Sequence, residues 1–277
     1  MFAVVLIALT LSLLIMFVVV VFAFLDVAFG PQRVYDGGRI KQDWQPPLIH
    51  DDELFAWAAD VARSNVRRRL PHQGGVKTAR NIATDIYAGT TYAIESAPHK
   101  PKRDSEHDCS SCRHQMIAVT PPEALAVVET ICTKHPGDVN RIRNQAIENA
   151  KRVADMDLTQ YQAAKIVCPL LCDGNTCAAN GMRPIHCRGW FPLPDRQNEV
   201  GSSSEDAGTI DAHAHTVGQG AENGLASELD ERGLDGNRYE LNSALAVAFD
   251  TPNAAELWAN GEPVFERCKP HDTIRAT

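Results

Sequence analysis

The chain has 277 residues and a formal net charge of −8, which suits a globular domain with a core of its own. The acidic balance provides no basic surface for nucleic acid, so we expect no nucleic-acid partner. Eight cysteines are too few for a disulfide scaffold at this length. All of them except Cys268 lie between Cys109 and Cys187, and this grouping predicts that they bind a ligand.

An uncharged apolar stretch opens the chain and predicts a membrane anchor over residues 1–25. No side chain between Phe2 and Leu25 is charged, and a helix of that length, at about 1.5 Å per residue, crosses a hydrocarbon core of roughly 30 Å. A cleaved signal peptide fits less well, because no basic segment precedes the run and the run exceeds the usual apolar length. Lysine and arginine follow the span and do not precede it. The positive-inside rule therefore predicts a single-pass protein of the inner (cytoplasmic) membrane, with its C-terminal domain in the cytoplasm.

The rest of the chain predicts a mostly α fold: a small irregular helical domain around a cysteine metal cluster, with one N-terminal transmembrane helix. Prolines and glycines mark the linkers, and apolar residues at helical spacing mark the helices. The predicted parts are a transmembrane anchor (1–25), a juxtamembrane linker (26–50), a helical region (51–105), a cysteine-cluster metal-binding domain (106–194), a flexible linker (195–209) and a C-terminal helical segment (210–277).

Individual helices are predicted from the same spacing and from their end signals. The best start signal is Thr-Pro-Pro-Glu at 120–123, where Thr120 can cap the helix, a proline occupies its first turn and Glu123 lies three residues on. Cys132 falls on the apolar stripe of this helix, so we expect it to be buried as a small hydrophobic residue. The predicted helices are 51–70, 76–96, 120–135, 139–153, 158–167, 225–229, 239–249 and 252–259.

Two groups of cysteines carry the functional prediction. The first is Cys109-Ser-Ser-Cys112, a spacing at which two thiolates can bind one metal, as in zinc knuckles and iron–sulfur loops. A redox dithiol shares this spacing, but a thioredoxin-type site needs a strand before it and a helix straight after it. Here a charged loop precedes the pair and Arg113-His-Gln follows it. We therefore favour metal binding over redox catalysis for this pair.

The second group contains Cys168, Cys172, Cys177 and Cys187. An Asp-Gly-Asn turn signal between Cys172 and Cys177 would return the chain toward one centre. Prolines in the same stretch stiffen the backbone and lower the entropy lost when ligands are fixed. The stretch has little periodicity, so a bound metal would explain how it is ordered. Cys172 stays open between a metal ligand and an ordinary loop thiol.

Together these motifs resemble the YkgJ-like CxxCxxCC family, which is described as zinc- or iron-chelating domains. The resemblance covers roughly residues 106–194, about a third of the chain. The residues that carry it are Cys109-Ser-Ser-Cys112, Val-Thr-Pro-Pro-Glu-Ala at 119–124, Cys168-Pro-Leu-Leu, Cys177, and Arg-Pro-Ile-His-Cys-Arg at 183–188.

The resemblance implies a cofactor of zinc or iron, including an iron–sulfur cluster. Arg113 stands where the family often has a second adjacent cysteine, so the ligand set here is smaller than the family's. Flagellin lysine methylases share this type of cluster, which implies an enzymatic branch. The metal ligands that the resemblance implies are Cys109, Cys112, Cys168, Cys177 and Cys187.

Several side chains near the cysteines have alternative roles. Arg183 and Arg188 either stabilise thiolates through their charge or form surface ion pairs. We expect His186 to be a surface or hydrogen-bonded histidine, with a role at the metal as the alternative. Trp190 is expected to pack over the cysteine loop. Cys268 is expected to lie apart from the cluster, with folding back onto it as the alternative.

Two functions from different classes fit these patterns. The first is a membrane-anchored metal-binding module, and the second is an iron–sulfur-dependent redox or protein-modifying, methylase-like enzyme. The sequence contains no HExxH motif, no nucleotide-binding glycine loop and no triad signature. We therefore favour the first function and leave enzymatic activity open. An exported domain with disulfides needs the opposite topology and is least favoured. The expected partners are a metal ion and the membrane; no protein partner is indicated.

Overall fold

The computed structural model describes residues 51–70, 76–95, 112–172, 176–190 and 210–271. It also describes two short strands, β1 (Tyr35–Asp36) and β2 (Arg39–Ile40), which pair antiparallel. The chain divides into two compact units, residues 1–45 and 46–277.

The predicted membrane anchor over residues 1–25 lies outside the described residues, and so does Cys109. Within the ranges given above, no helix is long and apolar enough to cross a membrane. The transmembrane helix therefore stays a prediction from the sequence.

The described part of the second unit is mostly helical, which confirms the predicted fold class at that level. Its short strands form two antiparallel pairs: β3 (Ala118–Val119) with β6 (Tyr239–Glu240), and β4 (Leu171–Cys172) with β5 (Thr176–Cys177). The helices are α2 (Asp51–Arg69), α3 (Val76–Glu95), α4 (Pro121–Lys134), α5 (Val139–Val153), α6 (Leu158–Ala164), α7 (Ile185–Gly189), α8 (Ala212–Glu231), α9 (Leu241–Asp250) and α10 (Ala254–Ala259).

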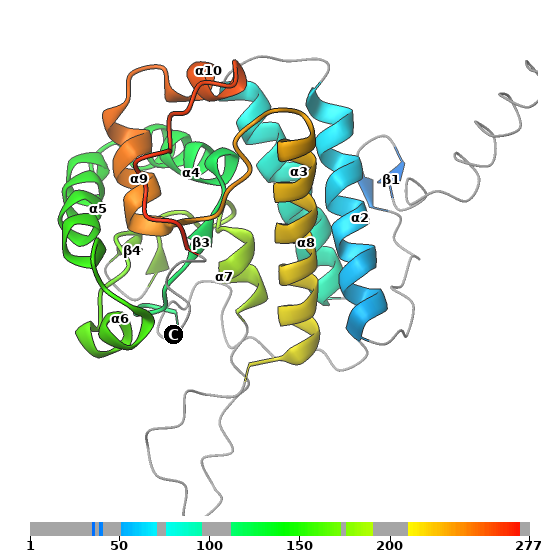
Figure 1. Cartoon of the computed structure of the whole chain (residues 1–277), viewed down its shortest axis with the longest axis horizontal. Coiled ribbons are helices and arrows are strands. Elements are labelled where there is room, and N and C mark those ends of the chain that lie inside the picture. The colour runs from blue at the N-terminus through cyan, green and yellow to red at the C-terminus, as the bar shows by residue number, and fades with distance from the viewer. Residues whose placement is uncertain are drawn as a thin grey trace, which may run out of the picture. The chain divides into compact units, whose positions relative to one another are not determined.

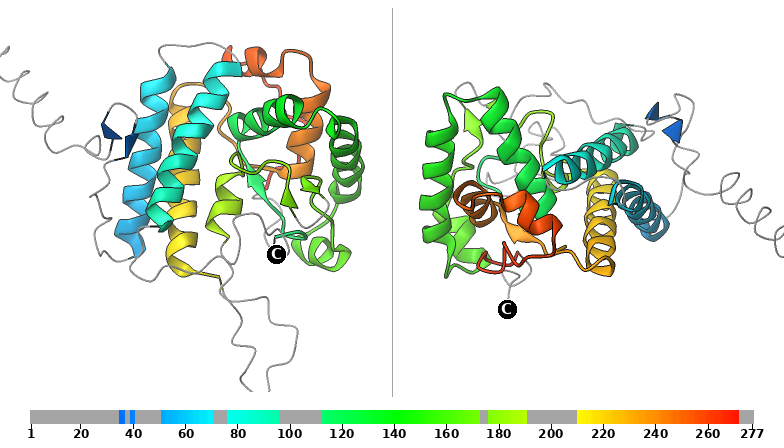
Figure 2. Two further views of the ribbon diagram at one scale, coloured as in Figure 1. Left: turned by 180° about the vertical axis from the view of Figure 1, so that it is seen from behind. Right: turned by 90° about the horizontal axis from the view of Figure 1, so that it is seen from above.

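These helices pack as two groups. α2, α3 and α8 lie side by side in one group, whereas α5 and α4 pack against α9 in the other (Figures 1 and 2). The groups are joined where α3 packs on α4, and α7 packs against both α8 and α3. Elements from the first, middle and last thirds of the second unit are thus in direct contact.

A common apolar core connects these groups. It includes Ile82 of α3, Ile131 of α4 and Leu225 of α8, all fully buried. Trp258 of α10 and Phe265 are buried in the same core. Because the core takes residues from before and after the cysteine motifs, the C-terminal helices support the cysteine-bearing region directly.

Glycines of α8 allow two other helices to approach its backbone closely. A Cβ added to Gly224 would overlap the carbonyl oxygen of Ala59 and lie 2.7 Å from its Cα, and a Cβ on Gly220 would lie 2.9 Å from the Cβ of Ala58. Both contacts are with α2. Gly218 instead faces α7, where an added Cβ would lie 2.9 Å from the Cα of Gly189. The α8 glycines therefore fix the separations of α2–α8 and α7–α8.

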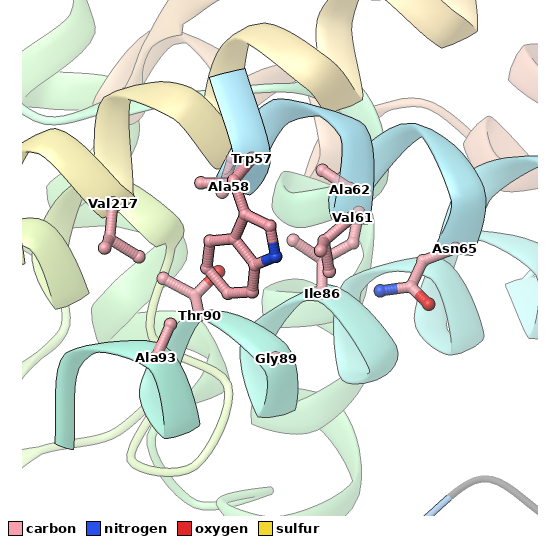
Figure 3. Close-up of a pocket in the computed structure, with 11 residues that line it drawn as sticks. Trp57, Ala58, Val61, Ala62, Asn65, Ile86, Gly89, Thr90, Ala93 and Val217 are labelled. Atoms are coloured by element: carbon pink, nitrogen blue, oxygen red, sulfur yellow. The ribbon is translucent and has the colours of Figure 1, made fainter. Parts of the chain in front are cut away.

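A small hollow remains between α2, α3 and α8. Trp57 reaches from α2 toward α3, with Thr90 and Gly89 on the opposite side (Figure 3). Its volume is only about 10 Å³, which is near the lower limit for a single water molecule. The hollow is a packing feature of the three helices and is too small to bind a larger ligand.

One buried carboxylate ties α4 to α7. The Oε2 atom of Glu123 accepts hydrogen bonds from the backbone N–H and the hydroxyl of Thr120, each at 2.9 Å. Its Oε1 atom accepts from the backbone N–H of Ile185 at 2.8 Å and from the hydroxyl of Tyr87 at 3.3 Å. The predicted helix start at Thr120 is therefore correct, and Glu123 in addition positions the first turn of α7.

The predicted burial of Cys132 is wrong, because Cys132 is exposed. The buried face of α4 includes Ala124, Val127 and Ile131. Cys132 follows Ile131 directly and is rotated by about 100° from it around the helix. Of the predicted stripe of Leu125, Val128, Ile131 and Cys132, Leu125 and Ile131 are buried, and Cys132 lies at its solvent-facing edge.

Candidate functional site

The first cysteine motif ends in a tight turn before β3. The backbone N–H of Gln115 donates to the carbonyl of Cys112 at 3.1 Å, and Cys112 is half-buried. The partner cysteine, Cys109, lies outside the described residues, so the structure places only Cys112 of this pair.

The turn that carries Cys112 is hydrogen-bonded to the segment that carries Cys168. The backbone N–H of Cys168 donates to the carbonyl of Arg113 at 2.8 Å. Nδ1 of His114 lies 3.3 Å from the carbonyl oxygen of Ile166, which fits a hydrogen bond when that nitrogen carries the proton. Folding therefore brings the first motif to the start of the second.

A hairpin then determines where the next two cysteines point. The backbone N–H of Leu171 donates to the carbonyl of Cys168 at 3.2 Å, and in the β4–β5 pair Leu171 faces Cys177 while Cys172 faces Thr176. Cross-strand partners share a face of the ladder and neighbouring residues alternate. Cys172 and Cys177 are therefore directed to opposite faces of the hairpin.

Cys172 has a basic neighbour on its own face. Nη2 of Arg141, on α5, donates to Sγ of Cys172 at 3.5 Å, and Nη1 of the same side chain donates to the carbonyl of Leu171 at 3.3 Å. Sequence reasoning missed Arg141, because it lies on a helix far from the motif along the chain.

Cys187 lies in the short helix α7, beside the buried Tyr87 and the partly buried Arg188. Burial raises the pKa of Tyr87 well above its ordinary value, and the negative charges of Glu123 and then Cys187 add to the increase. Burial lowers the pKa of Arg188, although Tyr87 and Cys187 act against that decrease. Cys187 is therefore electrostatically coupled to both side chains.

Arg188 fixes the loop that precedes α7. Its guanidinium donates to the carbonyls of Arg183 and Gly181, both at 2.8 Å, and to the hydroxyl of Thr91 at 2.6 Å. The same group stacks on the ring of Tyr87, 4.6 Å from its centroid. Arg188 thus joins the cysteine-bearing loop to α3 and also interacts electrostatically with Cys187.

His186 lines a small cavity of about 50 Å³, together with Trp190, Gln219 and His215. Its Nδ1 atom lies 3.4 Å from Oε1 of the buried Glu222. Burial lowers the pKa of His186, but the neighbouring carboxylate of Glu222 outweighs it and the net shift is upward. This agrees with the expectation of a hydrogen-bonded histidine. Sequence reasoning missed Glu222 because it comes from α8.

The cysteines Cys168, Cys172, Cys177 and Cys187 are all partly buried and pack against the main core. They are therefore partly screened from water. Across the ranges that the structure describes, no three histidine, cysteine, aspartate or glutamate side chains are arranged to hold a metal ion. Cys109 lies outside those ranges.

Two other thiols lie apart from these motifs and differ in accessibility. Cys132 is exposed on α4, whereas Cys268 is buried and donates to the carbonyl of Ser243 at 3.5 Å. Burial raises the pKa of Cys268 to about 12. Burial also raises the pKa of Cys132, but Cys132 is exposed to the reagent. At pH 8 nearly all of the buried Cys268 is protonated, and the thiolate is the reactive form.

We therefore expect iodoacetamide to alkylate Cys132 at least about a hundredfold faster than Cys268 in the folded protein. Peptide mass spectrometry over a time course measures both rates. In denaturant the two thiols should react alike. Equal rates in the folded protein would contradict the burial of Cys268.

Comparisons of the chain with models of known protein families, with curated proteins and with solved structures gave no match. The resemblance to the YkgJ-like family therefore depends on the short motifs alone and stays a prediction.

Proposed function

We propose that this chain is a membrane-anchored protein that binds zinc or iron, including an iron–sulfur cluster, through the thiolates of two distant motifs. Residues 1–25 form the anchor, and the rest of the chain lies in the cytoplasm. The ligands are Cys109, Cys112, Cys168, Cys177 and Cys187, as the resemblance to the YkgJ-like family implies.

The hydrogen bond from the Cys168 N–H to the Arg113 carbonyl carries this proposal. It joins the residue after Cys112 to Cys168, so the backbone segments that carry these two cysteines are held next to each other. The register of β4–β5 directs Cys172 and Cys177 to opposite faces, and Cys172 accepts a hydrogen bond from Arg141. Cys177 is taken as the further ligand because the family resemblance implies it. Thiolate donors suit zinc and iron, and do not separate them.

Metal content tests the proposal. The full-length chain, purified in detergent without air, should contain about one zinc, or a cluster of about four irons, per chain. Cys109→Ser and Cys168→Ser should each lose most of the metal, because removing one thiolate breaks a site of four or five ligands. Cys132→Ser is the matched control, since Cys132 is an exposed thiol outside the motifs. Full metal content in Cys168→Ser would reject the ligand assignment.

The same preparation separates the two functions. A colourless protein with zinc supports a structural or sensing role, whereas a brown protein with broad absorption near about 400 nm supports the iron–sulfur alternative and its redox or protein-modifying chemistry. Removing residues 1–25 tests the anchor: the truncated protein should leave the membrane fraction, and continued membrane retention would contradict the anchor.

A further inference from the structure

The cavity beside α7 is lined by polar side chains from distant segments of the chain. They come from α7, from α8, from the residue before β6 and from the C-terminal segment, and α7 packs directly on α8 (Figure 1). The backbone N–H of His271 donates to the carbonyl of Arg238 at 2.9 Å, which holds the last two segments together. The side chains in question are His186, His215, Gln219, Glu222, Arg238 and His271.

Two glycines form the wall of this cavity where α7 and α8 touch. Gly189 and Gly218 both line the cavity, and a Cβ added to Gly218 would lie 2.9 Å from the Cα of Gly189. This wall is therefore made of backbone, and no side chain extends from it into the space. The volume of about 50 Å³ is roughly four times what a single water molecule needs. A ligand of about four or five non-hydrogen atoms has that size.

A buried carboxylate organises the polar side chains around the cavity. Glu222 is only 5% exposed. Its Oε1 lies 3.4 Å from Nδ1 of His186, and its Oε2 lies 3.6 Å from Nη1 of Arg238. The ring of His271 meets that of His186 edge-on, with 5.5 Å between the ring centroids. Because Arg238 offsets the charge of Glu222, the carboxylate orients its neighbours without leaving an unbalanced negative charge at the cavity.

Four of these side chains can donate hydrogen bonds at the cavity. A guanidinium carries five N–H donors, so Arg238 can hold Glu222 and still donate to a ligand. The rings of His215 and His271 each carry at least one N–H in either protonation state, and Gln219 carries an amide NH2 group. Several donors around one small space fit a compact ligand that is rich in acceptor oxygens.

We propose that this cavity binds a small oxyanion, of the size of phosphate or bicarbonate, through Arg238, His215 and Gln219. The planar guanidinium matches two oxygens of such an ion, and an imidazole and an amide supply further donors. Glu222 keeps Arg238 in place while the ion binds. The site requires no metal at the cysteine motifs, so it stands or falls independently of the proposed function.

Calorimetric titration of the full-length chain in detergent tests this site. Inorganic phosphate and bicarbonate are titrated separately at one pH and one ionic strength, with chloride as the reference ion. At least one of the two should bind saturably in a one-to-one ratio, and comparison of the two titrations shows which ion fits better. If neither binds more tightly than chloride, the cavity holds only water and the proposal is wrong.

His215→Ala and His213→Ala form a matched pair of variants on α8. His215 lines the cavity, whereas Nε2 of His213 lies 3.2 Å from the carbonyl oxygen of Ala93. Both histidines are partly exposed, so both variants should fold. Loss of one donor should weaken binding about fivefold to tenfold in His215→Ala, and His213→Ala should keep the wild-type affinity. Equal affinities of the two variants would contradict the site.

A second pair of variants removes an arginine that faces a buried glutamate of α8. Arg238→Gln should weaken binding by more than about tenfold, because the ion loses a charged donor. Arg232→Gln is the control, since Nε of Arg232 lies 3.1 Å from Oε1 of the buried Glu228, and it should bind like the wild type. Wild-type binding in a folded Arg238→Gln would overturn the proposal. If that variant does not fold, the His215 and His213 pair decides.

Discussion

Gly224→Ala should lower the free energy of unfolding by about 2–4 kcal/mol. An alanine in a helix interior would by itself stabilise α8 by about 1 kcal/mol over glycine, so packing must account for the loss. The added Cβ would overlap the backbone of Ala59 in α2, and backbone atoms cannot rotate away as a side chain can. The two helices would have to separate along their length.

Urea unfolding monitored by circular dichroism measures this loss. Gly220→Ala should show a loss of the same kind, because its Cβ would overlap the carbonyl of Phe55 one turn along the same face. Gly137→Ala is the control: no atom lies within 4 Å of its added Cβ, and we expect a change within about 0.5 kcal/mol. Equal stability of Gly224→Ala and the wild type would contradict the close α2–α8 approach.

Glu123→Ala should cost about 3–4 kcal/mol, because it leaves buried donors without an acceptor at about 1–3 kcal/mol each. The donors are the N–H and the hydroxyl of Thr120, the N–H of Ile185 and the hydroxyl of Tyr87. Glu129→Ala is the control on the same helix, since Glu129 is partly exposed and pairs with Arg80 at 3.0 Å. Exposed pairs contribute less than about 1 kcal/mol.

The effect of Glu123 should also depend on pH. Burial raises its pKa and outweighs the opposing hydrogen bonds from Ile185 and Thr120. The folded carboxyl therefore binds its proton more tightly than the unfolded one, so its contribution is full below the unfolded pKa and is lost as pH rises through the folded pKa. The stability gap between the wild type and Glu123→Gln, a neutral isostere, should narrow as pH rises above the range in which an unfolded glutamate titrates. If this stability gap widened as pH rose, the pKa of Glu123 in the folded protein would be lowered and not raised.

Local chemistry made most helix positions predictable. The helix predicted over 51–70 is α2, and the start signal at Thr120 begins α4 one residue later, at Pro121. Capping residues, prolines and helical spacing act within a few residues of chain, so the sequence displays them directly. The helix predicted over 225–229 was much too short, because α8 begins at Ala212. Its glycines oppose helix formation locally, and packing on α2 and α7 overrides that preference.

For the candidate site, too, local features could be predicted from the sequence, whereas contacts between distant segments could not. The sequence by itself determined a mostly helical chain, an apolar stretch at 1–25 of membrane-spanning length, and the cysteine spacings that predict a thiolate metal site. Only the tertiary structure decided that the Arg113 carbonyl meets the Cys168 N–H, that Cys172 and Cys177 point to opposite faces, and that Asn149 of α5 donates to the carbonyl of Val167. Spacing along a chain reports local geometry, whereas contacts between distant segments depend on how the helices pack around the core they share.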